Sequence, residues 1–170
     1  MPHIIVKAML LVRNGLPAAP GEAQAGDKLL FSRGYDAVKK EAFLRPLGGH
    51  VEFGERGEET ILREMKEELG CEALGVRFIS MIENLFTYNG EQGHEIVLVY
   101  EGKLSDESFY KKDSFTFMEG ERKTEAGWFS KSDAEKEGIP IYPPFAYFTL
   151  NYETPPSPPL LGGELKRGSE

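Results

Sequence analysis

The most informative part of the sequence is GHVEFGERGEETILREMKEELGC, which runs from Gly49 to Cys71. A glycine-rich, acidic segment leads into residues typical of a short helix that ends at Gly70. One side of this helix carries four apolar residues that we expect to face the core: Ile61, Leu62, Met65 and Leu69. Another side carries three carboxylates within about a third of the circumference: Glu64, Glu67 and Glu68.

Three like charges at helical spacing need something to offset their repulsion, which weakens an isolated helix by about 0.3 kcal/mol per pair. A divalent cation such as magnesium is the first candidate, because it prefers oxygen ligands and is held by few protein carboxylates. A solvated acidic helix face is the alternative that charge pattern alone would favour.

The full spacing decides between these alternatives. It reads Gly, five residues, Glu, seven residues, then Arg-Glu-apolar-any-Glu-Glu-any-Gly-apolar. The defined positions are all filled: Gly49, Glu55, Arg63, Glu64, Met65, Glu67, Glu68, Gly70 and Cys71. This pattern closely resembles the signature of the Nudix hydrolases, the MutT-like family. Cys71 fills the last apolar position, where a free cysteine behaves as a small hydrophobe.

Around the signature, defined here as residues 49–71, the sequence predicts several strands and, from residue 130, a further helix. The strands are expected at residues 4–12, 28–32, 41–47, 76–88, 94–104, 114–118 and 125–129, and the helix at residues 130–138. This order suits an α/β fold with a mixed sheet packed between helices. The resemblance implies the same fold, an α/β/α sandwich with a mixed central sheet and the signature as a loop-helix-loop on one side.

The domain organisation is expected to be simple. Residues 1–150 suit one domain, and residues 151–170 form a Pro/Gly-rich tail that we expect to be flexible or weakly docked. A terminal helix is expected from Pro144. The Pro-, Gly- and Ala-rich residues 14–27 form a loop that is either mobile or part of a substrate lid.

The Nudix resemblance implies magnesium-dependent hydrolysis of a diphosphate linkage by water attack at phosphorus. The substrate would be a nucleoside diphosphate derivative or a nucleoside triphosphate. Glu64, Glu67 and Glu68 match the family's magnesium ligands, with the carbonyl of Gly48 as an additional ligand and manganese as a substitute metal. Either Glu64 or Glu67 would orient or deprotonate the water.

Arg63 and Glu55 match the pair that braces the loop of the signature against its helix. Arg33 and Arg45 flank the segment that leads into the signature and are candidates for binding substrate phosphates. The alternative, favoured for Arg33, is an ordinary surface arginine. A further acidic ligand remains open among four residues: Glu95, Glu119, Glu121 and Glu125. The alternative for Glu95 is a solvated strand end. Three aromatic residues are either core or base-stacking residues: Tyr35, Phe86 and Tyr88.

Composition limits the remaining possibilities. The net charge of −8 argues against binding a nucleic acid polymer, although a bound metal can still attract a small phosphorylated substrate. The single cysteine excludes an internal disulfide, and with no leader or membrane span recognised we expect a cytoplasmic protein. The resemblance is compatible with a homodimer, because dimers are common in the family. The functional alternative is a non-catalytic Nudix-fold domain that binds a nucleotide as a sensor or regulator.

Overall fold

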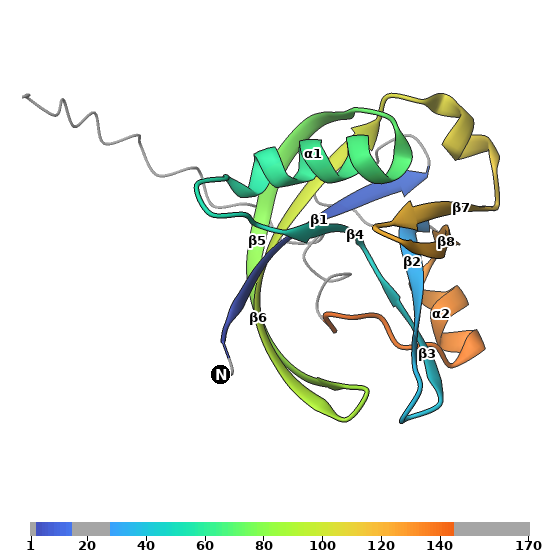
Figure 1. The fold of residues 1–170 in the computed structure, drawn as a ribbon. Coiled ribbons are helices and arrows are strands. Elements are labelled where there is room, and N and C mark those ends of the chain that lie inside the picture. Colours follow the sequence, from blue (N-terminus) through green and yellow to red (C-terminus); the bar gives the residue numbers. More distant parts are fainter. Residues whose placement is uncertain (1–2, 15–27, 145–170) are drawn as a thin grey trace, which may run out of the picture.

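The computed structural model describes residues 3–14 and 28–144, which build a mixed sheet with a helix on each face (Figure 1). The strands are β1 (Ile5–Asn14), β2 (Lys28–Asp36), β3 (Glu41–Arg45), β4 (Leu47–His50), β5 (Ala73–Tyr88), β6 (Glu91–Leu104), β7 (Ser114–Glu119) and β8 (Arg122–Phe129). The helices are α1 (Gly57–Leu69), the short 3₁₀ helix η1 (Glu107–Lys111) and α2 (Lys131–Glu137).

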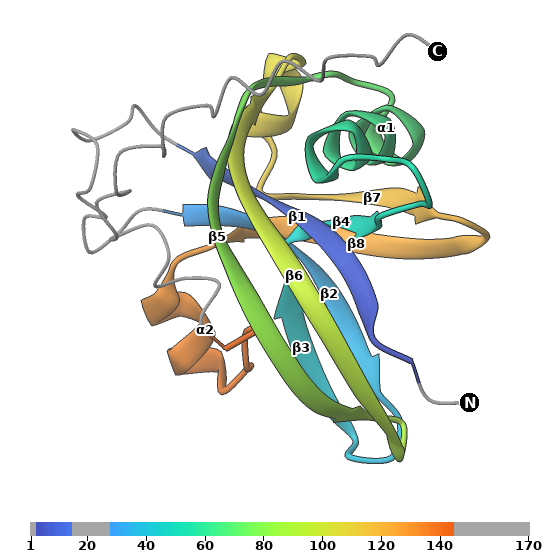
Figure 2. The ribbon, with the colours of Figure 1, turned by 90° about the vertical axis from the view of Figure 1, so that its left-hand side faces the viewer.

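The sheet order is β5-β6-β1-β2-β8-β7, with β3 paired to β2 and β4 paired to β1. Strands β1 and β6 run parallel, and the other pairs are antiparallel. Figure 2 shows β1 beside β6, with α1 across one side of the sheet and α2 on the other. The pairing of β4 with β1 puts Gly48 and Gly49 opposite Met9 and Ala8, which anchors the start of the signature at the centre of the sheet.

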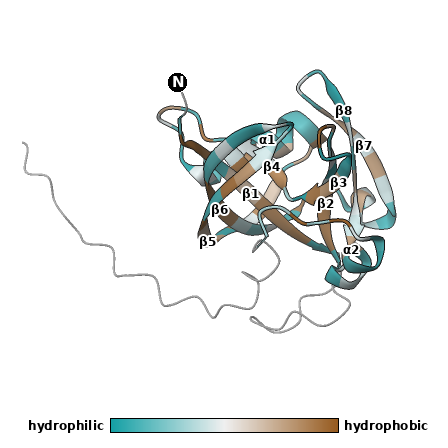
Figure 3. Ribbon diagram, turned by 90° about the horizontal axis from the view of Figure 1, so that it is seen from below, coloured by the Kyte–Doolittle hydropathy of each residue, from teal (hydrophilic) through white to brown (hydrophobic). Residues whose placement is uncertain are grey.

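Strand β1 divides the core between the two helices, because successive side chains of a strand point to opposite faces. One core cluster contains Ala8 and Leu10 together with Ile61 and Met65 of α1. The other contains Met9 and Leu11 together with Ala134 of α2. In Figure 3, β1 and β2 are coloured largely as hydrophobic, whereas α2 is largely hydrophilic. The expected α/β/α sandwich is thus confirmed.

Helix α1 follows the predicted pattern at three of its four apolar positions. Ile61 and Met65 are fully buried, and Leu69 packs against the same cluster. Leu62 was predicted to face the core, but 42 % of its surface is exposed because it lies on the solvent side of the helix. The helix ends at Gly70, which adopts φ 68° and donates its N–H to the carbonyl of Lys66.

The predicted single extended piece at residues 41–47 is two strands with different partners. Pro46 separates β3, which pairs with β2, from β4, which pairs with β1. Proline has no N–H to donate to a ladder, so it suits the point at which the chain changes partner. Strand β2 also continues to Asp36, four residues beyond its predicted end.

The connection between β7 and β8 is shorter than the predicted strands at residues 114–118 and 125–129 would leave. Strand β8 starts at Arg122 rather than Glu125, and the turn contains Gly120 at φ 60°. The helix predicted at residues 130–138 is α2. Ser130 is the N-cap, and its hydroxyl accepts a hydrogen bond from the N–H of Asp133 at 3.0 Å.

Several predicted features lie outside the described residues. They are residues 15–27 of the predicted loop, most of the predicted terminal helix and the tail at residues 151–170. In the parts of the chain that are described, no helix is long and apolar enough to cross a membrane.

Substitution of Ile61 by alanine tests how α1 is held. Because Ile61 is fully buried against β1, Ile61→Ala should lower the free energy of unfolding by about 2–5 kcal/mol. Leu62→Ala is the matched control on the exposed side and should cost less than about 1 kcal/mol. Urea unfolding measures both, and similar losses in the two variants would contradict this assignment of the helix faces.

Candidate active site

Arg63 of α1 is bound to Glu55 in the preceding loop by two parallel hydrogen bonds. Its Nε donates to Glu55 Oε1 at 2.8 Å, and its Nη2 donates to Glu55 Oε2 at 3.0 Å. Glu55 Oε2 also accepts from the N–H of Glu52 at 3.1 Å and from the buried Thr60 hydroxyl at 2.7 Å. The two-point geometry of guanidinium and carboxylate fixes the loop on the helix.

The same contacts keep both groups charged. Hydrogen bonds from Arg63, followed by those from Thr60 and Glu52, lower the pKa of Glu55 to about 2. Hydrogen bonding to Glu55 raises the pKa of Arg63 further above its usual range. Arg63 Nη2 also donates to the carbonyl of His50 at 3.1 Å, which ties the end of β4 to α1. The bracing arrangement implied by the family resemblance is therefore present in the structure.

A cavity of about 390 Å³ lies between α1, β4 and the β7–β8 turn. Its lining is glycine-rich and acidic: Gly48, Gly49, His50, Glu64, Glu67, Glu68, Met118, Glu119 and Gly120. We call it the carboxylate cavity. A Cβ at Gly49 would overlap the carboxylate of Glu64, and a Cβ at Gly48 would overlap the carbonyl of Ala8. Glycine at both positions therefore lets the helix carboxylate approach the strand.

Glu68 is the carboxylate of this cavity whose negative charge is least compensated by neighbouring protein groups. Its Oε2 is buried and accepts no hydrogen bond from the residues that the structure describes. Burial, reinforced by the nearby charges of Glu119 and Glu64, raises the pKa of Glu68 to about 8. A buried carboxylate without a partner is costly, so this position favours a positively charged ligand.

The other carboxylates of this cavity are bound to arginines. Arg63 Nη1 donates to Glu64 Oε1 at 2.8 Å and to Glu67 Oε2 at 3.3 Å, and Arg45 forms an ion pair with Glu119. As they stand, the described residues contain no group of three His, Cys, Asp or Glu side chains arranged to hold a metal ion. The donor set itself, carboxylate oxygens beside backbone carbonyls, is the one that a hard divalent cation prefers.

The predicted metal and catalytic residues thus lie together. Arg33, one of the two candidates for binding phosphate, lies apart from them. Glu64, Glu67, Glu68 and Gly48 line the carboxylate cavity, and Glu55 and Arg63 support it. Arg45 reaches its edge through the ion pair with Glu119. Arg33 instead lies 3.3 Å from Glu137 of α2 and stacks over the Phe129 ring at 5.5 Å.

Of the four acidic residues left open by the sequence, only Glu119 lines the carboxylate cavity. Glu121 and Glu125 are exposed. Glu95 is neither there nor at a solvated strand end, because β6 begins at Glu91 and Glu95 is only 4 % exposed. Strand β7, which carries Glu119, lies beside α1 only in the folded protein, so local sequence offered no signal to distinguish Glu119.

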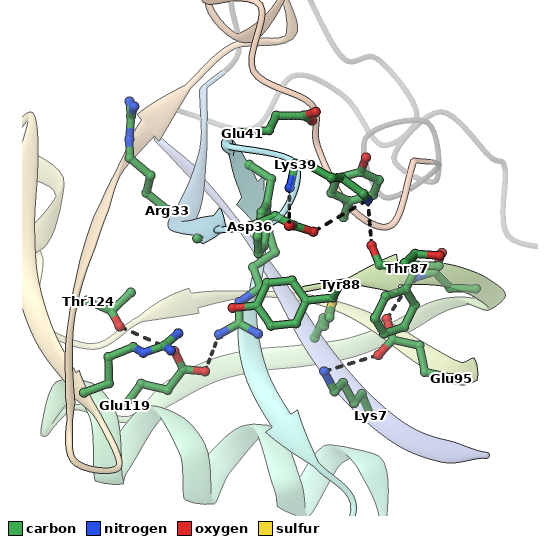
Figure 4. A pocket seen from close by; sticks show the side chains of 18 residues that line it. Lys7, Arg33, Asp36, Lys39, Glu41, Thr87, Tyr88, Glu95, Glu119 and Thr124 are labelled. Carbon is green, nitrogen blue, oxygen red and sulfur yellow. Dashed lines mark hydrogen bonds and ion pairs between the residues drawn. The ribbon is translucent and has the colours of Figure 1, made fainter. Parts of the chain in front are cut away.

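A second cavity of about 430 Å³ lies on the α2 side of the sheet and also reaches Glu119 (Figure 4). Basic and aromatic side chains contribute to its wall: Lys7, Arg33, Lys39, Phe43, Arg45, Phe86, Tyr88, Arg122 and Tyr142. We call it the aromatic cavity. Both predicted phosphate-binding arginines line it, as do two of the three aromatic residues considered for stacking. The third, Tyr35, is exposed at 56 %.

Two solved structures have a fold similar to that of this chain. The chain is similar to a NUDIX hydrolase from Nitrosomonas europaea, with a TM-score of 0.56 and 16 % identity, over 87 % of this chain and 86 % of that one. It is also similar to a protein described as an ADP compounds hydrolase, with a TM-score of 0.53 and 16 % identity, over 88 % of this chain and 72 % of that one. At these identities the likeness concerns the fold alone.

The family follows from a comparison of sequence. The model of the NUDIX domain matches residues 22–147, and the chain belongs to the NUDIX family. The resemblance carried by the signature is confirmed. Members of this family are hydrolases of nucleoside diphosphate derivatives, which gives the general chemistry expected of the carboxylate cavity.

The raised pKa of Glu68 makes stability depend on pH in the absence of metal. Between its usual value of 4.5 and about 8, the folded protein binds a proton that the unfolded chain has released, so stability should fall as pH rises through this window. Glu68→Gln removes the titration. Relative to wild type, it should gain on the order of a few kcal/mol between pH 5 and pH 8.

Urea unfolding in EDTA at these two pH values measures the difference. Glu67→Gln is the matched control, because the Glu67 side chain is 60 % exposed. An equal pH dependence in wild type and both variants would show that Glu68 is not the titrating group.

Proposed function

We propose that this chain catalyses magnesium-dependent hydrolysis of the diphosphate linkage of a nucleoside diphosphate derivative or a nucleoside triphosphate. The observation that carries the proposal is the buried, unpartnered oxygen of Glu68, in a cavity that also contains Glu64, Glu67 and Glu119. Family membership supports the reaction type. We further propose that residues 1–150 form the hydrolase domain.

The donor set fits the metal that the family implies. Glu64, Glu67 and Glu68, with the carbonyl of Gly48, would hold magnesium, and manganese would substitute. When bound, the metal would neutralise diphosphate charge, polarise the phosphoryl oxygen and lower the pKa of a bound water. Glu119 is the additional acidic residue that the cavity supports as a ligand.

The protein residues would supply position and proton transfer. The Arg63–Glu55 pair holds α1 and the end of β4 in a fixed relation, so the carboxylates need not reorganise as charge develops. Either Glu64 or Glu67 would accept the proton of the attacking water. Arg45 lies at the boundary between the two cavities, where its guanidinium suits a phosphate group. Arg33, which is bound to Glu137, is the weaker phosphate candidate.

Chromatographic detection of the nucleotide products formed from a substrate panel tests the reaction directly. Nucleoside triphosphates, nucleotide sugars, ADP-ribose and dinucleoside polyphosphates should be assayed with magnesium and with EDTA. Activity should require the metal, and Glu68→Gln should lower kcat by about 100-fold or more while leaving circular dichroism unchanged. Wild type that binds nucleotides but is as inactive as Glu68→Gln across the panel would favour the non-catalytic binding domain.

Glu119 can be tested separately from the helix carboxylates. If it helps to hold the metal, Glu119→Gln should raise the magnesium concentration needed for half-maximal activity by about tenfold. It should also reduce the rise in melting temperature that magnesium produces in wild type. Glu121→Gln, two residues away and exposed, is the control that should behave as wild type. Identical magnesium responses in the two variants would remove Glu119 from the ligand set.

A further inference from the structure

We infer that the aromatic cavity holds the base of the substrate and that Glu95, flanked by Lys7 and Asn84, selects guanine. This inference rests on the proposed function, which places the diphosphate at the carboxylate cavity, and it extends that function to a class of nucleotide. Figure 4 shows Glu95 and Lys7 pointing toward one another at the wall of the cavity.

The three polar residues come from neighbouring strands on the α2 side of the sheet. Asn84 of β5 is the direct cross-strand partner of Glu95 of β6, and β6 lies beside β1, which carries Lys7. Next to them on this face are apolar core residues: Met9, Ile82 and Val97. Asn84 and Glu95 are only 7 % and 4 % exposed. A charged cluster buried in an apolar face has a substantial desolvation cost, which a role in binding would explain.

The hydrogen bonds that Glu95 makes within the protein leave its Oε2 atom able to accept further hydrogen bonds. Asn84 Nδ2 donates to Oε1 at 2.8 Å, and the Lys7 ammonium lies 3.2 Å from Oε2. Despite that ion pair, the buried Oε2 accepts no hydrogen bond of ordinary geometry from any described residue. A carboxylate has room for about four hydrogen bonds, so this group can still accept donors from a ligand in the cavity.

Guanine matches this arrangement better than the other bases. Its N1–H and N2–H₂ are adjacent donors, which can be accepted by the two oxygens of one carboxylate, and its O6 beside them can accept from an ammonium. Adenine and cytosine each present a single amino donor beside an acceptor, and uracil presents one N–H between two carbonyls. Only guanine therefore uses both oxygens of Glu95 as well as Lys7.

The walls of the cavity suit a flat ring. Phe43 lies against Gly34 of the neighbouring strand, and Phe86 lies against Gly93, so closely that a Cβ at either glycine would overlap the ring. Phe43 is further held by an edge-on contact with Tyr88, with ring centroids 5.9 Å apart. Rings fixed in this way provide stacking surfaces for a base at little entropic cost.

The aromatic cavity and the carboxylate cavity meet at Glu119. Arg45 and Glu119 line the aromatic cavity, and Glu119 also lines the carboxylate cavity, so their ion pair marks the boundary between the two. A nucleotide whose base contacts Glu95 could direct its phosphates toward Arg45. Its diphosphate linkage would then face the helix carboxylates.

Binding of nucleoside monophosphates to the full chain in EDTA tests the inference. These ligands carry the base but no diphosphate linkage, so binding does not depend on hydrolysis. We expect guanosine monophosphate to bind at least about tenfold more tightly than the adenosine, cytidine and uridine monophosphates, by isothermal titration calorimetry. Glu95→Gln should abolish this preference, and Phe86→Leu should weaken all four ligands by about tenfold.

Glu83→Gln is the matched control, since Glu83 lies one residue from Asn84 on β5 but is exposed and outside the cavity. Circular dichroism and urea unfolding show whether each variant is folded, and the Phe86→Leu result stands if Glu95→Gln does not fold. Equal binding of the four bases, or a preference for another base, would overturn the assignment. Guanine-selective binding without hydrolysis of any diphosphate would support it while refuting the proposed function.

Discussion

The two-point contact between Arg63 and Glu55 is the constraint on which the candidate site depends. It joins a loop, a helix and, through the carbonyl of His50, the end of β4. The third nitrogen of the same guanidinium holds Glu64 and Glu67. One cation therefore positions the helix against the sheet and partly neutralises two carboxylates. Lysine could not do this, because its ammonium lacks the planar fork that makes several directed hydrogen bonds at once.

Charge compensation explains why the pKa values of Glu55 and Glu68 shift in opposite directions. Glu64 and Glu67 share Arg63, and Glu119 is paired with Arg45, whereas Glu68 has no such partner among the described residues. The pKa of Glu68 is accordingly raised, while that of Glu55, in full contact with Arg63, is lowered. The protein thus tolerates several acidic groups in one cavity by pairing all but one of them, and the unpaired one favours an external cation.

The sequence predicted what depends on local spacing and failed where distant strands meet. The acidic face of α1 follows from helical periodicity. The Arg63–Glu55 pair was implied by the family resemblance, since Glu55 precedes the helix. Leu62 was predicted to be buried because it is apolar and follows Ile61 in the sequence. The spacing of the apolar residues alone does not show where the buried stripe ends. Glu119 could not be distinguished from Glu95, because only the pairing of distant strands brings Glu119, and not Glu95, to the carboxylate cavity.

Strand β1 has a consequence for how such a protein can change during evolution. Its alternate residues serve both cavities, since Ala8 backs Gly48 and Gly49 while Lys7 and Met9 line the aromatic cavity. A single inserted or deleted residue within the strand would reverse every side chain beyond it. Changes in length are therefore confined to the loops, and the two cavities must diverge by substitution alone. Because both cavities use β1, a change in this strand affects both of them.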